Sequence, residues 1–537
     1  MKKAAILPVS ILLLFASCAT LKEQSGEEAS VSSNKKNIYS VYLTGNYGAK
    51  PADNQNQQQF SQILKEAQQN SAVLFLGDNI SSYKKDSLSD QNVLKEQTQI
   101  IKDYKGKTYF IPGENEWKYK DNRKGKVAQD FLVKANENTN IYFPKNGSPL
   151  GKVSVNENLD IIFIDSQWYI SNWDDVKYIN ENSPDIKTRR RFLEELESLI
   201  KDAAFKNVII AMHHPIFSNG KHGGKYSFND YLHPLPIVGF GDKAVRKLGG
   251  SNPQDIAYYR YRELTSFIAA LMKLSDNITL VSGHEASLQY LEGNGVHQII
   301  SGSFSDSEAT KLSKEVITAP GGKLSYKGIF SSSENGYAKL NYYDDGSSDV
   351  EFYSFKNNAL LYRHAVNKAL PVIKENNSEV KLPVLASTSK AQILTKEETS
   401  KSGFYKILWG KHYRDHYSTE ITAKTALLDT LYGGLTILKE GGGHQSQSLR
   451  LEDKNGRQFV MRSLRKDALK FLRFKLKGIA FDPNSFDDTA AEEVVSDFFT
   501  TAHPYAQLAV NDLAEAASVN HSNTDCIIFQ NSRDLEV

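Results

Sequence analysis

The sequence repeats a short apolar run that ends in a turn carrying acids, amides or histidines. The pattern recurs in SVYLTGNYG, SAVLFLGDN, KTYFIPGEN, LDIIFIDSQ, NVIIAMHHP and ITLVSGHE. Continuous apolar strands bounded by turn residues are typical of sheets covered on both faces. Helix-like stretches lie between the runs, at about residues 55–69, 91–103, 188–202 and 259–275. Strands that alternate with helices predict an α/β core.

The polar residues that follow these strands form the most informative group of candidates. In open α/β sheets, ligands bind beyond the carboxyl ends of the strands. Acids and imidazoles that converge on one rim are typical of metal sites. An alternative is that these are solvated loops on a scaffold with no metal. The rim residues predicted in this way are Asn46, Asp78, Glu114, His213, His214 and His284.

The order and the sequences of these loops resemble those of a known family. GNYG, GDN, PGENEW, HHPIFSNGKHGG and SGHEASLQ, within about residues 37–350, look like the motifs of calcineurin-like metallophosphoesterases, closest to the purple acid phosphatase branch. The resemblance implies a four-layer βα sandwich, in which two packed β-sheets are flanked by helices. It also implies a pair of metal ions that orient a phosphate ester and activate water for attack on phosphorus.

One half of the family's metal pair keeps its ligands. By resemblance, Asp78 stands where an aspartate bridges both metals, and His213 and His284 stand where histidines hold metal two. Glu114 replaces an asparagine that also binds metal two. Two carboxylates and two imidazoles suit a divalent transition metal, namely zinc, manganese or iron. We therefore expect one such ion per chain.

The other half is degenerate. Asn46 replaces the metal-one aspartate, Ser81 replaces a tyrosine ligand, and Ala286 replaces the second histidine of the Gly-His-x-His loop. An amide binds a cation more weakly than a carboxylate because it carries no charge, and alanine offers no ligand atom.

The consequence for activity is open in the sequence. Asn115 stands where the family has a substrate-contacting histidine, and an amide cannot act as a general acid. His214 and His222 are the remaining candidates for contact with a phosphate. We predict a hydrolase of phosphate esters with a reduced, single-metal site and weak activity. The alternative is an inactive pseudophosphatase that serves as a binding or scaffold protein, with a protein partner in the envelope.

The N-terminal sequence predicts where the protein is located in the cell. Residues 1–18 contain two lysines, a short apolar core and small residues before Cys18, which resembles the lipobox of bacterial lipoproteins. We expect lipidation of Cys18, a polar tether over 19–36, and a lipid-anchored position in the bacterial cell envelope, at the outer membrane. The alternative is a plain signal peptide cut near Ala19. The formal net charge of +2 favours no nucleic-acid partner.

The chain is long enough for more than one domain. At 537 residues, two or three are expected. We place the phosphoesterase-like domain at 37–375, a polar linker at 376–400, and a smaller α+β module at 401–537. Within that module, SLRLED and RQFVMRSL around KNG predict a hairpin. We expect a truncated C-terminus, because the last residues contain no clear closing element.

Overall fold

A computed structural model provides the structure of the protein. It describes residues 23–25, 35–80, 87–120, 123–173, 186–203, 206–224, 236–247, 252–272, 277–293, 295–308, 310, 312, 317–318, 325–370, 386–440, 445–468 and 490–529. Contacts divide the chain into two compact units, formed mainly by residues 35–370 and by residues 386–529. The predicted signal peptide, with Cys18, and Ser81 lie outside the described residues.

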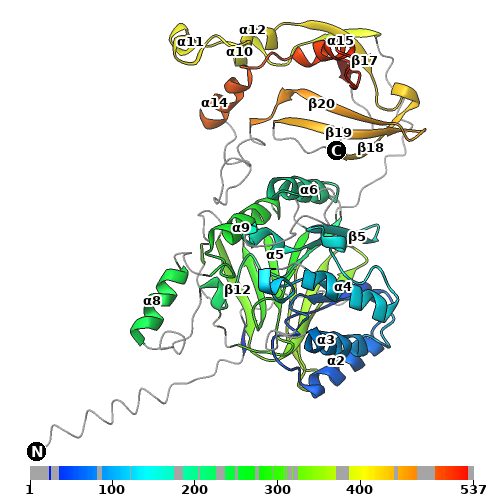
Figure 1. Ribbon diagram of the computed structural model, residues 1–537, viewed down its shortest axis with the longest axis vertical. Helices are drawn as coiled ribbons and strands as arrows, with labels where there is room; N and C mark the ends of the chain where they lie inside the picture. The colour runs from blue at the N-terminus through cyan, green and yellow to red at the C-terminus, as the bar shows by residue number, and fades with distance from the viewer. Residues whose placement is uncertain are drawn as a thin grey trace, which may run out of the picture. The chain divides into compact units, whose positions relative to one another are not determined.

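The first unit contains two large mixed sheets (Figure 1). One sheet has the order β1-β12-β9-β10-β8-β7-β6-β5, with β11 beside β12, and the other has the order β15-β14-β13-β2-β3-β4. The strands of the first sheet are β1 Glu23–Ser25, β5 Leu150–Asn156, β6 Leu159–Ile164, β7 Asn207–Met212, β8 Ile278–Ser282, β9 Leu288–Gly293, β10 Val296–Ser301, β11 Ile317–Thr318 and β12 Ser325–Ser332. Those of the second are β2 Asn37–Thr44, β3 Ser71–Leu76, β4 Lys107–Ile111, β13 Gly336–Tyr343, β14 Ser348–Ser354 and β15 Leu360–Ala365.

The two sheets pack face to face. Alternate residues of β2 and β3, such as Val41 and Leu74, share one apolar core with Ile161 of β6 and Ile209 of β7. The opposite face of β3 packs Val73 and Phe75 against helices. Each of these strands is apolar on both faces because both faces are covered. The predicted layered α/β fold is therefore confirmed.

Helices cover the outer faces of the sheets (Figure 1). Helices α2, α3 and α4 contribute residues such as Phe60, Leu94 and Leu132 to the core on the outer face of the second sheet. The helices of this unit are α2 Asn54–Glu66, α3 Ser87–Ile100, α4 Arg123–Asn136, α5 Ser166–Ile170, α8 Pro236–Lys247 and α9 Tyr259–Met272, with 3-10 turns η1 Asn115–Lys120, η2 Lys145–Gly147 and η4 Lys221–Gly223. Helix α6 (Arg189–Lys201) is shared between the two units.

The strand directions show where the predicted rim residues lie in each sheet. β2, β3 and β4 are parallel to one another, and so are β6, β7 and β8. Every candidate from Asn46 to His284 follows the carboxyl end of one of these strands. The carboxyl ends of parallel strands lie at one edge of a sheet, so the loops gather there.

The second unit has two small three-stranded sheets. β16 (Thr388–Ala391), β17 (Ile421–Ala426) and β21 (Ile527–Phe529) form one, and β18 (Leu435–Glu440), β19 (Ser446–Asp453) and β20 (Gln458–Lys466) form the other. The predicted hairpin is present as β19 and β20. The helices are α10 Lys396–Thr399, α11 Gly403–Trp409, α12 Arg414–Tyr417, α14 Ala490–Phe499 and α15 Val510–Ala516, with η5 Leu431–Gly433 and η7 Ala506–Ala509.

Two segments differ from the predicted tether and linker. Glu23–Ser25, inside the expected tether, pairs with β12 as an antiparallel strand. β16 and α10 lie inside the expected linker 376–400, because β16 finds a partner in β17 that lies some 30 residues further along the chain. A polar composition alone could not reveal either pairing. Among the described residues, no helix combines the length and the apolarity that a membrane crossing needs.

Candidate metal centre

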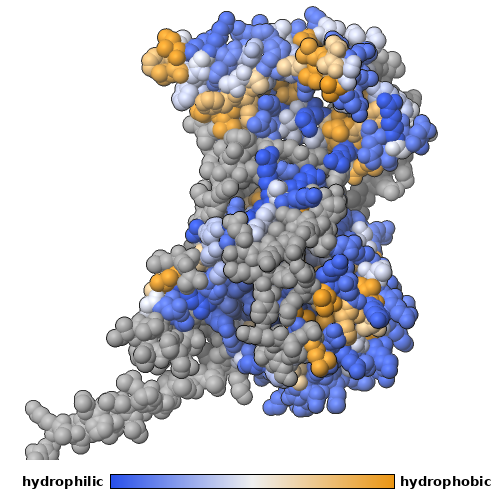
Figure 2. Space-filling model, viewed as in Figure 1, coloured by the Kyte–Doolittle hydropathy of each residue, from blue (hydrophilic) through white to orange (hydrophobic). Residues whose placement is uncertain are grey.

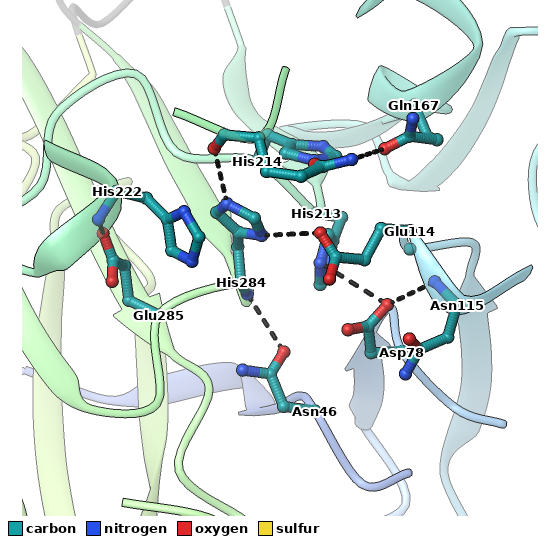
Figure 3. Close-up of polar contacts among 12 residues, drawn as sticks. Asn46, Asp78, Glu114, Asn115, Gln167, His213, His214, His222, His284 and Glu285 are labelled. Atoms are coloured by element: carbon teal, nitrogen blue, oxygen red, sulfur yellow. Dashed lines mark hydrogen bonds and ion pairs between the residues drawn. The ribbon is translucent and has the colours of Figure 1, made fainter. Parts of the chain in front are cut away.

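Four predicted ligands converge where the strand ends meet (Figure 3). Asp78 follows β3, Glu114 follows β4, His213 follows β7 and His284 follows β8. Nε2 of His213 lies 3.6 Å from Oδ1 of Asp78, and Nδ1 of His284 lies 3.8 Å from Oε2 of Glu114. Each imidazole therefore faces a carboxylate that comes from the other sheet.

The hydrogen bonds of the two imidazoles fix which nitrogen is a lone-pair donor. Nδ1 of His213 lies 2.8 Å from the carbonyl oxygen of Leu76, and Nε2 of His284 lies 3.0 Å from that of Gln254. A carbonyl only accepts, so these nitrogens carry the protons. Nε2 of His213 and Nδ1 of His284 are then free of protons in the neutral rings.

Burial keeps both rings neutral. Burial lowers the pKa of His213, and burial together with the neighbouring histidines lowers the pKa of His284 well below its ordinary value. Nε2 of His213 is also fully buried, with no hydrogen-bond partner among the described residues. An unpartnered buried acceptor is costly unless something binds to it, so the lone pair of this nitrogen fits a bond to a metal ion.

His214 lies beside these ligands but is engaged on both sides. The ring nitrogens of His213, His214 and His284 come within 4.8 Å of one another. However, Nδ1 of His214 accepts from the hydroxyl of Ser166 at 2.7 Å, and Nε2 donates to Oε1 of Gln254 at 2.7 Å. Because both nitrogens have partners, this geometry favours a positioning role over the phosphate contact predicted for His214.

His222 approaches from the 3-10 turn η4. Its ring centroid lies 4.2 Å from that of His284. Nδ1 lies 3.0 Å from Oδ1 of Asp255, whose carboxylate also binds Arg246 at 2.7 and 2.6 Å. Burial opposes protonation, but the bond to Asp255 and the charges of Glu285 and Glu114 outweigh it and raise the pKa of His222.

At the degenerate metal-one positions, the residues make structural hydrogen bonds. Asn46 takes a left-handed backbone conformation with φ of 57°, and its Oδ1 accepts from the backbone N–H of His284 at 3.0 Å. Asparagine is one of the few residues that adopt this conformation readily. Ala286 is buried, and its carbonyl accepts from the N–H of Glu308. Asn46 thus ties two loops together.

Comparisons with known proteins identify a domain in the first unit. Residues 52–242 match the sequence model of the calcineurin-like phosphoesterases. The chain contains a calcineurin-like phosphoesterase domain. No match was found among curated proteins.

Two solved structures are similar to this chain. The first, described as GAP50, the anchor in the inner membrane complex of Plasmodium, is 19% identical, with a TM-score of 0.37; the match covers 62% of this chain and 89% of that one. The second, the purple acid phosphatase PPD1 from yellow lupin seeds, is 11% identical, with a TM-score of 0.38; the match covers 64% of this chain and 55% of that one.

Glu116 organises two loops of the phosphoesterase domain, although sequence reasoning assigned it no role. Its carboxylate accepts four backbone N–H groups, those of Asp78, Asn79, Ile80 and Gly113, at 2.6 to 3.2 Å. Burial and the charge of Asp78 raise the pKa of Glu116 to about 7 despite these donors. A carboxylate at this depth serves the loop backbone, while Glu114, two residues earlier, faces the histidines.

Gln254 is another residue of the phosphoesterase domain that sequence reasoning missed. Its side chain bonds His214 and Gln167, and its carbonyl fixes the tautomer of His284. It lies in a polar loop before α9, far in sequence from every motif. No sequence signal marks such a residue, because its role depends on where the loop lies in space.

Proposed function

We propose that this chain is a membrane-anchored phosphoesterase with one metal ion, which binds phosphate esters and hydrolyses them slowly. The observation that carries the proposal is the orientation of two neutral imidazoles. Their unprotonated nitrogens face Asp78 and Glu114, which follow strands of the other sheet. A site of two imidazoles and two carboxylates fits zinc, manganese or iron.

The supporting residues fit the same role. Ligand imidazoles usually donate their second N–H to a carbonyl or carboxylate, which fixes the ring and its tautomer. His213 does so to Leu76, and His284 does so to Gln254. The ligand set therefore has the hydrogen bonds of a metal site, which supports retention of that function in this half.

The chemistry divides between the cation and the chain. A divalent ion held here would polarise a phosphoryl oxygen. Asp255 orients His222 through Nδ1, and the raised pKa of His222 favours the doubly protonated ring, so His222 is the candidate to donate a proton from Nε2 to a leaving oxygen. Arg246 holds Asp255 in turn. Asn115 cannot take this part, since its amide donates to the carbonyl oxygen of Ile80.

The membrane address remains a proposal drawn from the N-terminal sequence. Lipidation of Cys18 would attach the protein to the bacterial cell envelope, and we propose the outer membrane.

A second candidate function is a phosphatase-like scaffold without turnover. The observation that favours it is that residues at the metal-one positions make structural contacts or have no ligand atom. Asn46 ties the His284 loop, and Ala286 offers no ligand atom. Loss of one metal removes the clamp on both attacking and leaving oxygens that two-metal chemistry uses.

Metal content separates the two candidates. We expect about one zinc, manganese or iron per chain by elemental analysis of protein purified without chelator, and close to none in Glu114→Ala. His297→Ala, a histidine on β10 with its own partners Tyr290 and Glu292, is the matched control and should keep the metal. Slow release of p-nitrophenol from p-nitrophenyl phosphate, lost in Glu114→Ala, would support the enzyme. One metal without turnover would support the scaffold, and no metal after reconstitution would contradict the proposed site.

A further inference from the structure

The second unit displays an apolar helix to solvent. None of the side chains of α11 (Gly403–Trp409) is buried. The exposed fractions are 71% for Phe404, 81% for Ile407, 60% for Leu408 and 46% for Trp409. Figure 2 shows these side chains as an apolar group at the upper left of the view, where Figure 1 labels α11. Large apolar side chains gathered in this way mark an interaction surface.

The spacing of these residues gives the helix two faces. Phe404, Ile407 and Leu408 follow the i, i+3, i+4 pattern of one helical face. Tyr405 and Trp409 lie on the other, where the Trp409 ring contacts Phe498 of α14 at a centroid distance of 5.5 Å. The second face fastens the helix to the unit, and the first points away from it.

Buried polar contacts hold α11 in place. Arg414, only 2% exposed, makes a two-pronged ion pair with Asp497 at 2.7 Å on each side and donates to the carbonyls of Gly410 and Lys411. At the other end, the hydroxyl of Ser402 caps the helix by accepting from the N–H of Tyr405. Specific hydrogen bonds therefore fix both ends of α11, so its exposed position is part of the folded structure.

The charged side chains of the segment that contains α11 have one sign. Between Ser400 and Arg414 the chain carries Lys401, Lys406 and Lys411 and no carboxylate. Lys401 pairs with Glu493 at 2.6 Å, so among the described residues Lys406 and Lys411 are the lysines of this segment with no ion pair. Both lysines are exposed.

We propose that α11 is a membrane-interface helix, which inserts Phe404, Ile407 and Leu408 among the headgroups of an anionic lipid surface. A helix with aromatic and aliphatic residues on one face and lysines outside that face has the composition that favours this location. The lysines complement anionic headgroups. A projecting helix suits a fluid surface, which needs no shape-complementary pocket.

This contact is independent of the metal centre and of Cys18. It would add a second contact with the membrane beside the lipid expected on Cys18. Failure of the metal or turnover experiments would leave this proposal untouched, because none of its residues belongs to the phosphoesterase domain.

Vesicle binding tests the proposal with the chain from residue 18 onward carrying Cys18→Ser, so that no acyl chain contributes. We expect sedimentation with vesicles of phosphatidylglycerol and phosphatidylcholine in equal parts, and at least about tenfold weaker binding to pure phosphatidylcholine. Brominated lipids should quench the fluorescence of Trp409. Trp409→Phe should remove that quenching, since Trp168 is buried and Trp117 and Trp173 are largely shielded.

The variants address the apolar face and the charge separately. Ile407→Glu with Leu408→Glu should weaken binding at least about tenfold, because two large apolar side chains no longer leave water. Lys406→Glu with Lys411→Glu should remove the preference for the anionic vesicles. Leu513→Glu is the matched control, since Leu513 on α15 is 68% exposed but its nearest charged neighbours are Asp512 and Glu515.

Three results would overturn the proposal. The first is equal binding by Ile407→Glu/Leu408→Glu and the unsubstituted chain. The second is no binding to either vesicle. The third is a concentration-dependent dimer that the same double substitution abolishes, which would assign this face to a second copy of the chain. A folded circular dichroism spectrum of the double variant would show that lost binding is not lost structure.

Discussion

The two halves of the candidate metal centre differ in their side chains, although both halves follow strands of the same two sheets. On one side, Asp78, Glu114, His213 and His284 present oxygens and unprotonated nitrogens to one another. On the other side, the amide oxygen of Asn46 accepts a hydrogen bond from the backbone N–H of His284, and Ala286 has no ligand atom. The strand ends thus set where a side chain lies, and the residue type alone decides whether it binds a metal or joins two loops.

The largest expected effect breaks the retained half. His284→Ala should weaken metal binding by more than the 10- to 100-fold that outer-shell changes typically cause, because it removes a direct ligand. Asn46→Ala should keep about one metal per chain and lose about 1–2 kcal/mol of unfolding free energy, through its hydrogen bond and its left-handed backbone. Isothermal titration with zinc and urea unfolding measure the two effects. Equal metal loss in both variants would mean that the halves are not distinct.

The next prediction rebuilds the degenerate half. Asn46→Asp keeps an oxygen for the N–H of His284 and adds a second, charged oxygen, and Ala286→His supplies an imidazole. The double variant should bind close to two metals per chain and hydrolyse p-nitrophenyl phosphate at least about tenfold faster, since a second ion restores the clamp on the phosphate. Each single variant is the control. An unchanged metal content in a folded double variant would show that more than these two ligands is missing.

A smaller effect sharpens the role of the surrounding hydrogen bonds. Gln254→Ala leaves every ligand in place but frees Nε2 of His214 and breaks the link to Gln167. We expect about tenfold weaker metal binding, as is usual when an orienting partner is lost. Asn341→Ala on β13 removes a comparable amide, bonded to Ser40 and Asp349, and should not change metal affinity. Wild-type affinity in Gln254→Ala would assign the positioning of His284 to the backbone alone.

A pH-dependent effect on stability concerns Asp165, which supports the loop of the retained half. Asp165 accepts from Trp117, which follows the Glu114 loop, and burial raises the pKa of Asp165 from 3.8 to about 7. A raised folded-state pKa means that this stabilisation is complete below pH 3.8 and is lost as the pH rises toward 7. The unfolding free energy should therefore fall between pH 4.5 and 7.5, on the order of 1–3 kcal/mol. Asp165→Asn should flatten this slope in urea titrations at the two pH values, and an unchanged slope would contradict the assignment.

The sequence by itself determined the layered fold and the position of each candidate along it. Apolar runs such as Val73–Leu76 bury on both faces, so they had to become covered strands, and Asp78 had to follow one at its carboxyl end. The loss of metal-one ligands at positions 46 and 286 could also be predicted from the sequence, because an alanine has no ligand atom in any fold. Local pattern suffices where the cause is local.

Tertiary structure alone decided which nitrogen faces the carboxylates, that His214 is engaged on both sides, and that Asp255 orients His222. It also decided that Glu116 serves four backbone groups while Glu114 faces the histidines. These outcomes depend on partners such as Gln254, which lies 30 residues before His284 in the chain. A tautomer or a hydrogen bond is set by whichever groups the fold brings within about 3 Å, and sequence distance does not encode that.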